Sequence, residues 1–223
     1  MPEGLVSVVI PTMNEEGSIG TVIDEVRKSL ASRPFEILVV DTNSKDRTRE
    51  IAREKGAVVL DEPRRGYGRA YKTGFEKASG EFIVTLDADM TYPAEDIPGL
   101  LDMLESKQLD FITTNRFARM QKGAMSAKHR FGNWVLSVTT RVLFRVKLKD
   151  SQSGMWVFRK AVLKDLEVES DGMAFSEEIK VEAFRKKRAT EVPITYRIRV
   201  GEVKLSSWRD GIGNLKYLFK KRF

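Results

Sequence analysis

Apolar runs alternate with segments of helical spacing along the first 115 residues. The apolar runs predict buried strands over Leu5–Pro11, Glu36–Asp41, Val58–Leu60, Glu81–Leu86 and Asp110–Thr114. The segments between them space their hydrophobic residues as a helix does, and predict helices over Glu16–Ala31, Lys45–Lys55, Ala70–Ala78 and Ala94–Ser106. Strands buried on both faces that alternate with helices are typical of α/β proteins. The pattern therefore predicts an open, mostly parallel, Rossmann-like sheet with helices on both faces.

The second half of the chain is less regular. It predicts helices over Ser126–Val146, Phe175–Lys187 and Ser206–Arg222, and strands over Met155–Arg159 and Pro193–Val200. No linker divides it from the first half, so we expect one domain over residues 1–205, with a nucleotide and metal half (1–115) and an acceptor half (116–205). The helix over 206–223 carries apolar residues at helical spacing beside a basic end. We expect it to lie on a membrane surface, and the alternative is that its apolar face joins the core.

Composition removes several kinds of chemistry. The chain has no cysteine and one histidine, His129, which excludes disulfide frameworks, thiolate sites and multi-histidine zinc sites. It has no basic leader segment and no apolar run long enough to cross a bilayer, so we expect a cytoplasmic protein. What remains is chemistry based on carboxylates and phosphates.

Charge is distributed unevenly between the two halves. Residues 1–115 contain 14 Lys and Arg against 21 Asp and Glu, whereas residues 116–223 contain 25 against 11. An acidic half beside a basic half suggests a metal site together with a phosphate or membrane partner. The alternative is that the charges only solvate surface helices.

Acidic residues follow three of the predicted strands, where ligands bind in open α/β sheets. Asp87 and Asp89 are separated by one residue and can share Mg²⁺ or Mn²⁺, which prefer oxygen ligands. Asp41 is placed to accept hydrogen bonds from a ribose or base, although Asn43 and Ser44 beside it can instead cap the next helix.

Three further motifs leave alternatives open. Gly66 and Gly68 resemble a phosphate-binding loop, or mark a plain turn before a helix. Glu177 and Glu178 either favour a helix start through its dipole or include a general base. Basic residues that follow the later strands form a second possible phosphate site, or a solvated edge; they are Arg116, Arg197, Arg199 and Lys204.

Seven motifs, in order along nearly the whole chain, resemble glycosyltransferase family 2 and within it the dolichol-phosphate mannose synthase group. They are Val9–Glu16 (VIPTMNEE), Val40–Thr48 (VDTNSKDRT), Gly66–Ala70 (GYGRA), Leu86–Asp89 (LDAD), Thr114–Phe117 (TNRF), Asp150–Gly154 (DSQSG) and Arg199–Leu205 (RVGEVKL). The resemblance implies a GT-A fold. It also implies inverting transfer of a hexose from a nucleoside-diphosphate sugar to a polyprenyl phosphate at the cytoplasmic face of a membrane.

The resemblance also implies roles for individual residues. Those that match the family's nucleotide site are Pro11, Met13, Glu15, Asp41, Gly68, Lys72, Asp87, Ala88 and Asp89. Asp87, Asp89 and Thr91 match the metal site, and Asp87, Asp89 and Arg116 match the catalytic positions. Those that match contacts to phosphate or the lipid acceptor are Arg116, Arg130, Gln152, Ser153, Arg199 and Lys204.

The donor and the acceptor class stay open at this stage. Thr42, Thr91 and Val203 depart from the residues usual in the mannose synthases, so UDP-glucose and UDP-N-acetylglucosamine are alternatives to GDP-mannose. A lipid phosphate is already anionic at neutral pH and needs cations more than a base, which suits the basic second half. A hydroxyl acceptor would instead need a base such as Glu177 or Glu178. The alternative without catalysis is a basic module that binds membrane or nucleic acid, and we expect no nucleic-acid partner.

Overall fold

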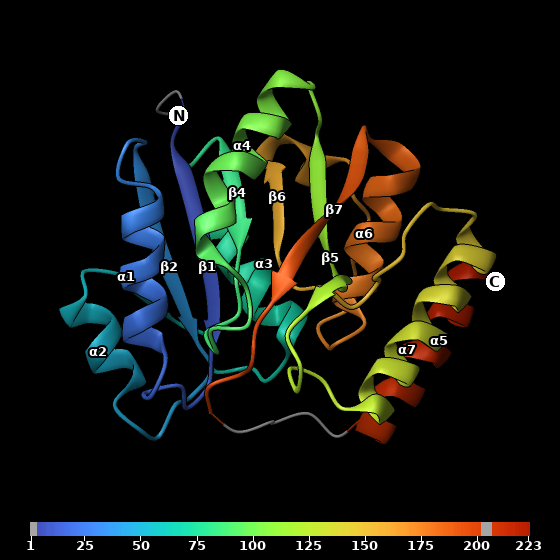
Figure 1. Cartoon of the computed structure of the whole chain (residues 1–223), viewed down its shortest axis with the longest axis horizontal. Coiled ribbons are helices and arrows are strands. Elements are labelled where there is room, and N and C mark those ends of the chain that lie inside the picture. Colours follow the sequence, from blue (N-terminus) through green and yellow to red (C-terminus); the bar gives the residue numbers. More distant parts are fainter. Residues whose placement is uncertain (1–3, 202–206) are drawn as a thin grey trace.

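A twisted sheet of seven strands runs through the centre of the computed structural model, which describes residues 4–201 and 207–223 (Figure 1). The strand order is β3-β2-β1-β4-β6-β5-β7. Strand β6 is antiparallel to both of its neighbours, β4 and β5, and the other pairs are parallel. The strands are β1 (Val6–Thr12), β2 (Phe35–Asp41), β3 (Val58–Asp61), β4 (Phe82–Thr85), β5 (Phe111–Met120), β6 (Trp156–Arg159) and β7 (Ala189–Tyr196).

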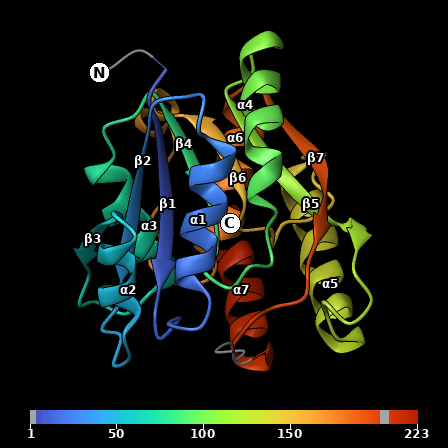
Figure 2. The ribbon, with the colours of Figure 1, turned by 60° about the vertical axis from the view of Figure 1, so that its left-hand side comes forward.

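Helices cover both faces of this sheet, as the sequence predicts (Figures 1 and 2). Val8 and Ile10 of β1 pack into a core with α1 (Ile19–Ser29) and α4 (Ile97–Ser106), whereas Val9 packs into the opposite core with α3 (Tyr67–Lys77) and α6 (Phe175–Lys186). Both sides of β1 are therefore apolar, because successive side chains of a strand point to opposite faces. The remaining helices are α2 (Thr48–Glu54), η1 (Ala94–Asp96), α5 (Ala127–Phe144), η2 (Lys160–Lys164) and α7 (Ser207–Arg222).

Helices α5 and α7 pack against each other at one end of the molecule (Figure 1). They share a small core with α6 and the segment after α5, formed by Leu136, Phe144, Val146, Leu148, Val181 and Leu218. The inner side of α7 is thus buried, and its outer side remains exposed. No helix in the described ranges is long and apolar enough to cross a membrane.

The last predicted strand is placed wrongly by the sequence pattern. We predicted Pro193–Val200, but β7 begins at Ala189 and ends at Tyr196. Ile198 and Val200 alternate with polar residues as in a strand, yet they are 55% and 40% exposed. The segment after β7 instead bonds to the loop after β4, because Arg197 N donates to Thr91 O at 2.9 Å and Val200 N donates to Asp89 O at 3.0 Å.

Other boundaries move by local effects. The predicted helix over Ala94–Ser106 divides into η1 and α4, with Pro98 in the first turn of α4. Helix α5 stops at Phe144, two residues early, because Arg145 adopts a left-handed conformation with φ 56°. Strand β5 continues to Met120, well beyond the predicted Thr114, because it pairs with β7 on both sides of a bulge.

The glycines before and within α3 are explained by close packing between protein segments. A Cβ on Gly68 would lie 2.5 Å from Ser170 O and 2.6 Å from Phe175 Cβ, and one on Gly66 would lie 2.3 Å from Asp171 O. Gly68 N also donates to Gly172 O at 3.2 Å. This contact between α3 and the segment before α6 accounts for the glycines without a phosphate ligand, which favours the plain-turn interpretation. The nucleotide contact of Gly68 stays a prediction.

We therefore expect Gly68→Ala to destabilise the protein by about 1–3 kcal/mol, because the new methyl group overpacks against backbone and Phe175. The matched control is Gly99→Ala in α4, where a Cβ meets no atom within 4 Å. That substitution should stabilise the helix by about 0.5–1 kcal/mol. Chemical denaturation measures both, and equal effects at the two sites would contradict the packing argument.

Candidate active site at the carboxyl ends of the parallel strands

The loops after β1, β2 and β4 meet at one edge of the sheet, at the lower edge in Figure 1, because parallel strands end on the same side. Asn14 N donates to Ser44 Oγ at 2.8 Å, and Lys45 N donates to Asn14 Oδ1 at 2.7 Å. Asn14, Asn43 and Met90 all have positive φ, at 56°, 54° and 65°. The left-handed region is energetically costly for a residue such as Met90. These three residues lie where the chain turns sharply after leaving a strand.

Asp41 anchors two of these loops from within. Its side chain accepts Thr12 Oγ1 at 3.2 Å, Ser44 N at 3.0 Å and the Ser44 hydroxyl, and Arg49 Nε lies 3.4 Å away. Asp41 is only 1% exposed, so its carboxylate is directed into the protein. That Asp41 contacts a nucleotide stays a prediction. In such a contact the nucleotide would replace one of these hydrogen-bond partners.

Asp87 and Asp89 occupy the end of β4 in different environments. Asp89 is buried: its Oδ1 accepts Thr91 N at 3.0 Å and Thr91 Oγ1 at 2.6 Å, and its Oδ2 pairs with Arg199 Nη2 at 2.6 Å. Asp87 is partly exposed, and its pKa is raised to about 7 by burial and by the negative charge of Asp89, against the opposing effects of Arg199 and Arg116. This edge therefore carries more negative charge than the protein alone neutralises.

Such a pair suits a divalent cation. Within the described residues no three His, Cys, Asp or Glu side chains gather in a way that could hold a metal, so the protein would supply the two carboxylates of Asp87 and Asp89. Mg²⁺ typically takes one or two carboxylates and completes its shell with water and substrate phosphates. Thr91 donates a hydrogen bond to Asp89 and so orients its carboxylate. The resemblance implies a different role for Thr91, that of a metal ligand. Its contact with metal stays a prediction.

Arg116 lies at the rim of this site, held by a residue to which the sequence analysis gave no role. Its Nε and Nη2 donate to the two oxygens of Asp150 at 2.8 and 2.9 Å, and its backbone N donates to Asp150 Oδ2 at 3.0 Å. The guanidinium also lies over the ring of Tyr196, 5.4 Å from its centroid. The pKa of Asp150 is lowered by Arg116, although burial opposes this. Asp150 begins the motif Asp150–Gly154, but it follows no predicted strand, and nothing in the motif indicates that it holds Arg116.

The other predicted basic residues do not gather at one place. Arg199 reaches Asp89, whereas Arg197 turns outward and pairs with Glu25 at 2.9 Å and with Glu95. Arg197 is therefore committed to tying the segment after β7 to α1 and η1. Arg130 is exposed near the start of α5, and Lys204 lies outside the described residues.

The segment after Asp150 brings Gly154 against Asp87. A Cβ on Gly154 would lie 3.2 and 3.3 Å from the two carboxylate oxygens of Asp87 and 2.7 Å from the Tyr67 hydroxyl. Ser153 is fully buried and shares a hydrogen bond of 2.7 Å with Thr114, so its side chain faces the protein interior. Gln152 donates to Glu177 Oε1 at 2.5 Å and accepts from Asn214 of α7 at 3.2 Å. Contacts of Gln152 and Ser153 with a lipid acceptor stay predictions.

Both candidate bases lie at the start of α6, as the helix-start interpretation expects, and both are buried. Glu178 is fully engaged: Oε2 accepts the backbone N of Glu169 and Ser170, and Oε1 accepts the Tyr217 hydroxyl and Lys221 Nζ. Glu177 accepts Gln152 on Oε1, while its Oε2 has no hydrogen-bond partner among the described residues. Burial raises the pKa of Glu177 to about 8, although Lys180 opposes this shift.

The predicted nucleotide contacts from β1 lie around a pocket of about 360 Å³. Met13 and Glu15 line it together with Asp46 and Gly201, and Pro11 lies just before them in β1. The segment after β7 thus returns to the loop after β1. Lys72 is on α3, where it donates to Glu169 O at 2.7 Å and pairs with Asp171 at 2.9 Å. Its contact with a nucleotide stays a prediction.

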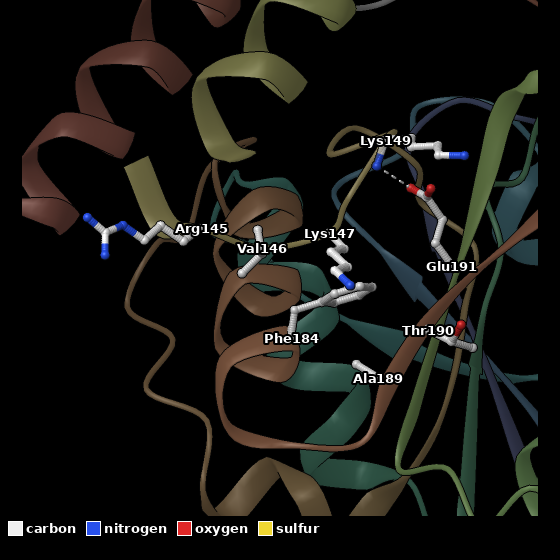
Figure 3. Close-up of a pocket in the computed structure, with 8 residues that line it drawn as sticks. All are labelled: Arg145, Val146, Lys147, Lys149, Phe184, Ala189, Thr190 and Glu191. Carbon is white, nitrogen blue, oxygen red and sulfur yellow. Dashed lines mark hydrogen bonds between the residues drawn. The ribbon is translucent and has the colours of Figure 1, made fainter. Parts of the chain in front are cut away.

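A second pocket, of about 430 Å³, lies away from the carboxyl ends of β1, β2 and β4 (Figure 3). It is lined by Arg145, Val146, Lys147, Lys149, Phe184, Ala189, Thr190 and Glu191. Figure 3 shows Arg145 pointing away from the cavity. Glu191 accepts the backbone N of Lys149 at 2.9 Å, so its carboxylate holds the segment that leads to Asp150.

The fold, an open and mostly parallel sheet covered by helices on both faces, defines an α/β protein of the Rossmann-like class. The structure is similar to the crystal structure of glucosyl-3-phosphoglycerate synthase from Mycobacterium tuberculosis in complex with Mn²⁺, UDP and glucosyl-3-phosphoglycerate. The TM-score is 0.78 at 20% identity, over 97% of this chain and 80% of that one. The phosphoglyceric acid complex of the same enzyme gives a TM-score of 0.81 at 19% identity, over 99% and 80%. These likenesses establish the predicted GT-A fold.

The sequence comparisons identify the family. The profile of glycosyl transferase family 2 matches residues 7–167, and the chain belongs to that family. The chain is 38% identical over 217 residues to the low-salt glycan biosynthesis hexosyltransferase Agl6 of Haloferax volcanii, with 95% of this chain and 52% of that protein aligned. It is 35% identical to the dolichyl-phosphate hexose transferase of the same organism (96% and 92%). It is 32% identical to the dolichol-phosphate mannosyltransferase of Pyrococcus furiosus (90% and 59%). The chain therefore spans little more than half of two of these relatives.

The raised pKa of Glu177 predicts how stability depends on pH. The folded protein keeps this carboxyl protonated up to about pH 8, whereas the unfolded chain releases the proton near 4.5. The unfolded state therefore binds fewer protons between these values, and Glu177 lowers stability as the pH rises. We expect Glu177→Gln to raise the Tm at pH 8 by more than at pH 5. Exposed Glu76→Gln is the control, and an equal gain at both pH values would contradict the assignment.

Proposed function

We propose that the protein transfers a hexose from a nucleoside-diphosphate sugar to a polyprenyl phosphate of the dolichyl type, with inversion at the anomeric carbon. The observation that carries this proposal is the paired Asp87 and Asp89 at the end of β4, with Arg199 on Asp89 and Arg116 at the rim. It is supported by relatives named as a dolichyl-phosphate hexose transferase and a dolichol-phosphate mannosyltransferase. Mannose from GDP-mannose is our first candidate, and UDP-glucose and UDP-N-acetylglucosamine are the alternatives.

In this proposal Asp87 and Asp89 would hold Mg²⁺ or Mn²⁺, which would supply positive charge for the diphosphate of the donor. A bound cation of this kind neutralises charge on a leaving diphosphate. A phosphate oxygen of the acceptor attacks the anomeric carbon, and the bond from that carbon to the diphosphate oxygen breaks. The acceptor oxygen carries no proton at neutral pH, so the step needs no base.

The residues of this chain have distinct tasks in that step. Arg199 holds Asp89 in place and brings positive charge to the diphosphate side of the site. Arg116, fixed by Asp150, provides positive charge on the other side of Asp87 for the acceptor phosphate. Met13 and Glu15 line the pocket that we assign to the nucleotide. A hydroxyl acceptor is less well served, because Glu178 is fully engaged and Glu177 is buried behind Gln152.

The outer surface of α5 and α7 suits a peripheral position on the cytoplasmic face of a membrane. Phe131 and Trp134 of α5 are 66% and 53% exposed, and Ile212 and Phe219 of α7 are 51% and 47% exposed. Exposed basic side chains lie on the same two helices: Lys128, Arg130, Lys216, Lys220 and Arg222. Exposed aromatic residues beside basic ones are the combination that an interfacial helix uses with anionic lipids.

Replacing Asp89 tests the reaction. We expect Asp89→Asn to lower transfer to polyprenyl phosphate by at least about 100-fold, since residues that only orient a metal ligand already cost about 10–100-fold. Exposed Asp102→Asn, on α4, is the matched control. The assay supplies GDP-mannose, UDP-glucose and UDP-N-acetylglucosamine separately, with Mn²⁺ and either polyprenyl phosphate or the free alcohol. Transfer to the alcohol alone, or full activity of Asp89→Asn, would contradict the proposal.

Replacing exposed aromatic residues tests the membrane surface. We expect Phe131→Ser with Trp134→Ser to reduce cosedimentation with anionic phospholipid vesicles by about tenfold, because two large apolar side chains no longer enter the interface. Val58→Ser on the edge strand β3 is the control, since Val58 is 51% exposed and lies at the opposite end of the sheet. Equal loss in both variants would exclude α5 as the contact surface.

A further inference from the structure

Lys180 of α6 is a fully buried lysine in the interior of the molecule. Its Nζ donates to Ser153 O at 2.6 Å and to Ser176 Oγ at 3.0 Å, and lies 5.5 Å from the centroid of the Trp156 ring. No salt bridge joins it to a carboxylate among the described residues, although Asp150 and Glu177 are close enough to influence its pKa. Fully buried lysines are rare, because removing the ammonium group from water is costly. The role of Lys180 must therefore lie in the groups that its amine contacts.

The amine holds the carbonyl of Ser153 together with two other donors. Trp156 Nε1 donates to this oxygen at 2.7 Å, and Ser176 Oγ lies 3.3 Å from it. Donors from α6 and β6 thus converge on a single carbonyl, which fixes the orientation of the peptide between Ser153 and Gly154.

The other side of the same peptide faces the site. Gly154 N donates to the Tyr92 hydroxyl at 2.6 Å, and in the next peptide Gly154 O accepts Thr85 Oγ1 at 2.7 Å. The Gly154 Cα is packed so closely to Asp87 that a Cβ would lie within 3.3 Å of both carboxylate oxygens. Four residues earlier, Asp150 holds Arg116. A rotation of the Ser153–Gly154 peptide would therefore disturb Asp87 and Arg116 together.

We infer that Lys180 is a positioning residue for the transfer reaction. It touches neither substrate, and it acts by fixing the Ser153–Gly154 peptide so that Asp87 and the Asp150–Arg116 pair keep their relative placement. The inference rests on the proposed function for its assay. It assigns to the interior of α6 a role that the strand-end residues do not reveal.

If Lys180 served folding alone, replacing it would lower the Tm and leave kcat unchanged. Lys180 forms no ion pair among the described residues, so an apolar residue of similar volume removes the desolvation cost of a buried ammonium group, and Ser153 O keeps its bonds from Trp156 and Ser176. We therefore expect Lys180→Met to keep the Tm of the wild-type protein or exceed it, and to lower kcat by about 10–100-fold. The KM for the nucleotide sugar should rise by less than kcat falls, because the loop after β1 that lines the nucleotide pocket is untouched. A misplaced reacting pair lowers the rate more than the binding.

Val181→Ala is the matched control on the same helix. Val181 is fully buried but packs into the cluster beneath α7, away from Ser153. Its truncation should lower the Tm by several degrees and leave kcat unchanged. Lys180→Met is thus expected to lower kcat without lowering the Tm, whereas Val181→Ala is expected to lower the Tm without lowering kcat.

The absence of cysteine from the chain allows a chemical rescue. Lys180→Cys is unfolded, alkylated with 2-bromoethylamine to restore an amine at nearly the same length, and refolded. A second sample receives iodoacetamide, which adds a neutral amide, and wild-type protein is refolded in parallel. We expect the aminoethylated protein to recover most of kcat and the amide derivative to recover little.

The outcomes separate the two proposals. If wild-type protein is inactive with every donor and acceptor, the proposed function fails. If wild type is active and Lys180→Met keeps its kcat, or both alkylated proteins recover equally, the positioning role is overturned. Should Lys180→Met not fold, Gly154→Ala decides, because its methyl group displaces Asp87 while Lys180 is intact. A Gly154→Ala protein that folds with wild-type kcat would overturn the proposal.

Discussion

The structure depends on compensating the negative charge gathered where β4 leaves the sheet. Asp89 is buried and Asp87 partly so, and both lie at the end of a strand whose backbone offers no positive charge. The compensating groups come from far along the sequence: Arg199 from the segment after β7, and Arg116 from β5. Burial and the negative charge of Asp89 raise the pKa of Asp87 to about 7, against the opposing effects of Arg199 and Arg116, so a cation bound here would favour the charged carboxylate.

This requirement shapes the chain around the site. The segment after β7 departs from the sheet to place Arg199 on Asp89, and its Val200 N bonds to the Asp89 carbonyl. The segment before β6 bends so that Asp150 receives Arg116 and Gly154 approaches Asp87. Helix α6 then supports that segment from behind through Lys180, and α7 reaches it through Asn214. The outer helices, which we propose lie at the membrane, reach this segment through Asn214 of α7, which donates to Gln152, and through Ser137 of α5, which accepts Ser151 N.

The sequence predicted the architecture well and the partners of its charged residues poorly. The apolar runs located the central strands β1, β2 and β4, because burial on both faces leaves a continuous hydrophobic signal. The pattern failed for β7, where alternation at Ile198 and Val200 imitated a strand that had already ended. Arg197 and Arg199 are two residues apart and look equivalent in the sequence, yet one pairs with Glu25 and Glu95 and the other with Asp89. Lys180 carried no local signal, and the motif that begins at Asp150 did not indicate its pairing with Arg116.

What the sequence determined by itself is the order of elements, the family, and the line of carboxylates that follows the parallel strands. These are local properties, since hydrophobic periodicity and strand-end position are set by neighbouring residues. The tertiary structure alone decided which cation meets which carboxylate, that Gly68 serves packing, and that a lysine lies buried behind Ser153. Charge pairing and desolvation depend on residues that are far apart in the chain, such as Arg116 and Asp150 or Asp89 and Arg199. These residues meet only when the sheet has formed.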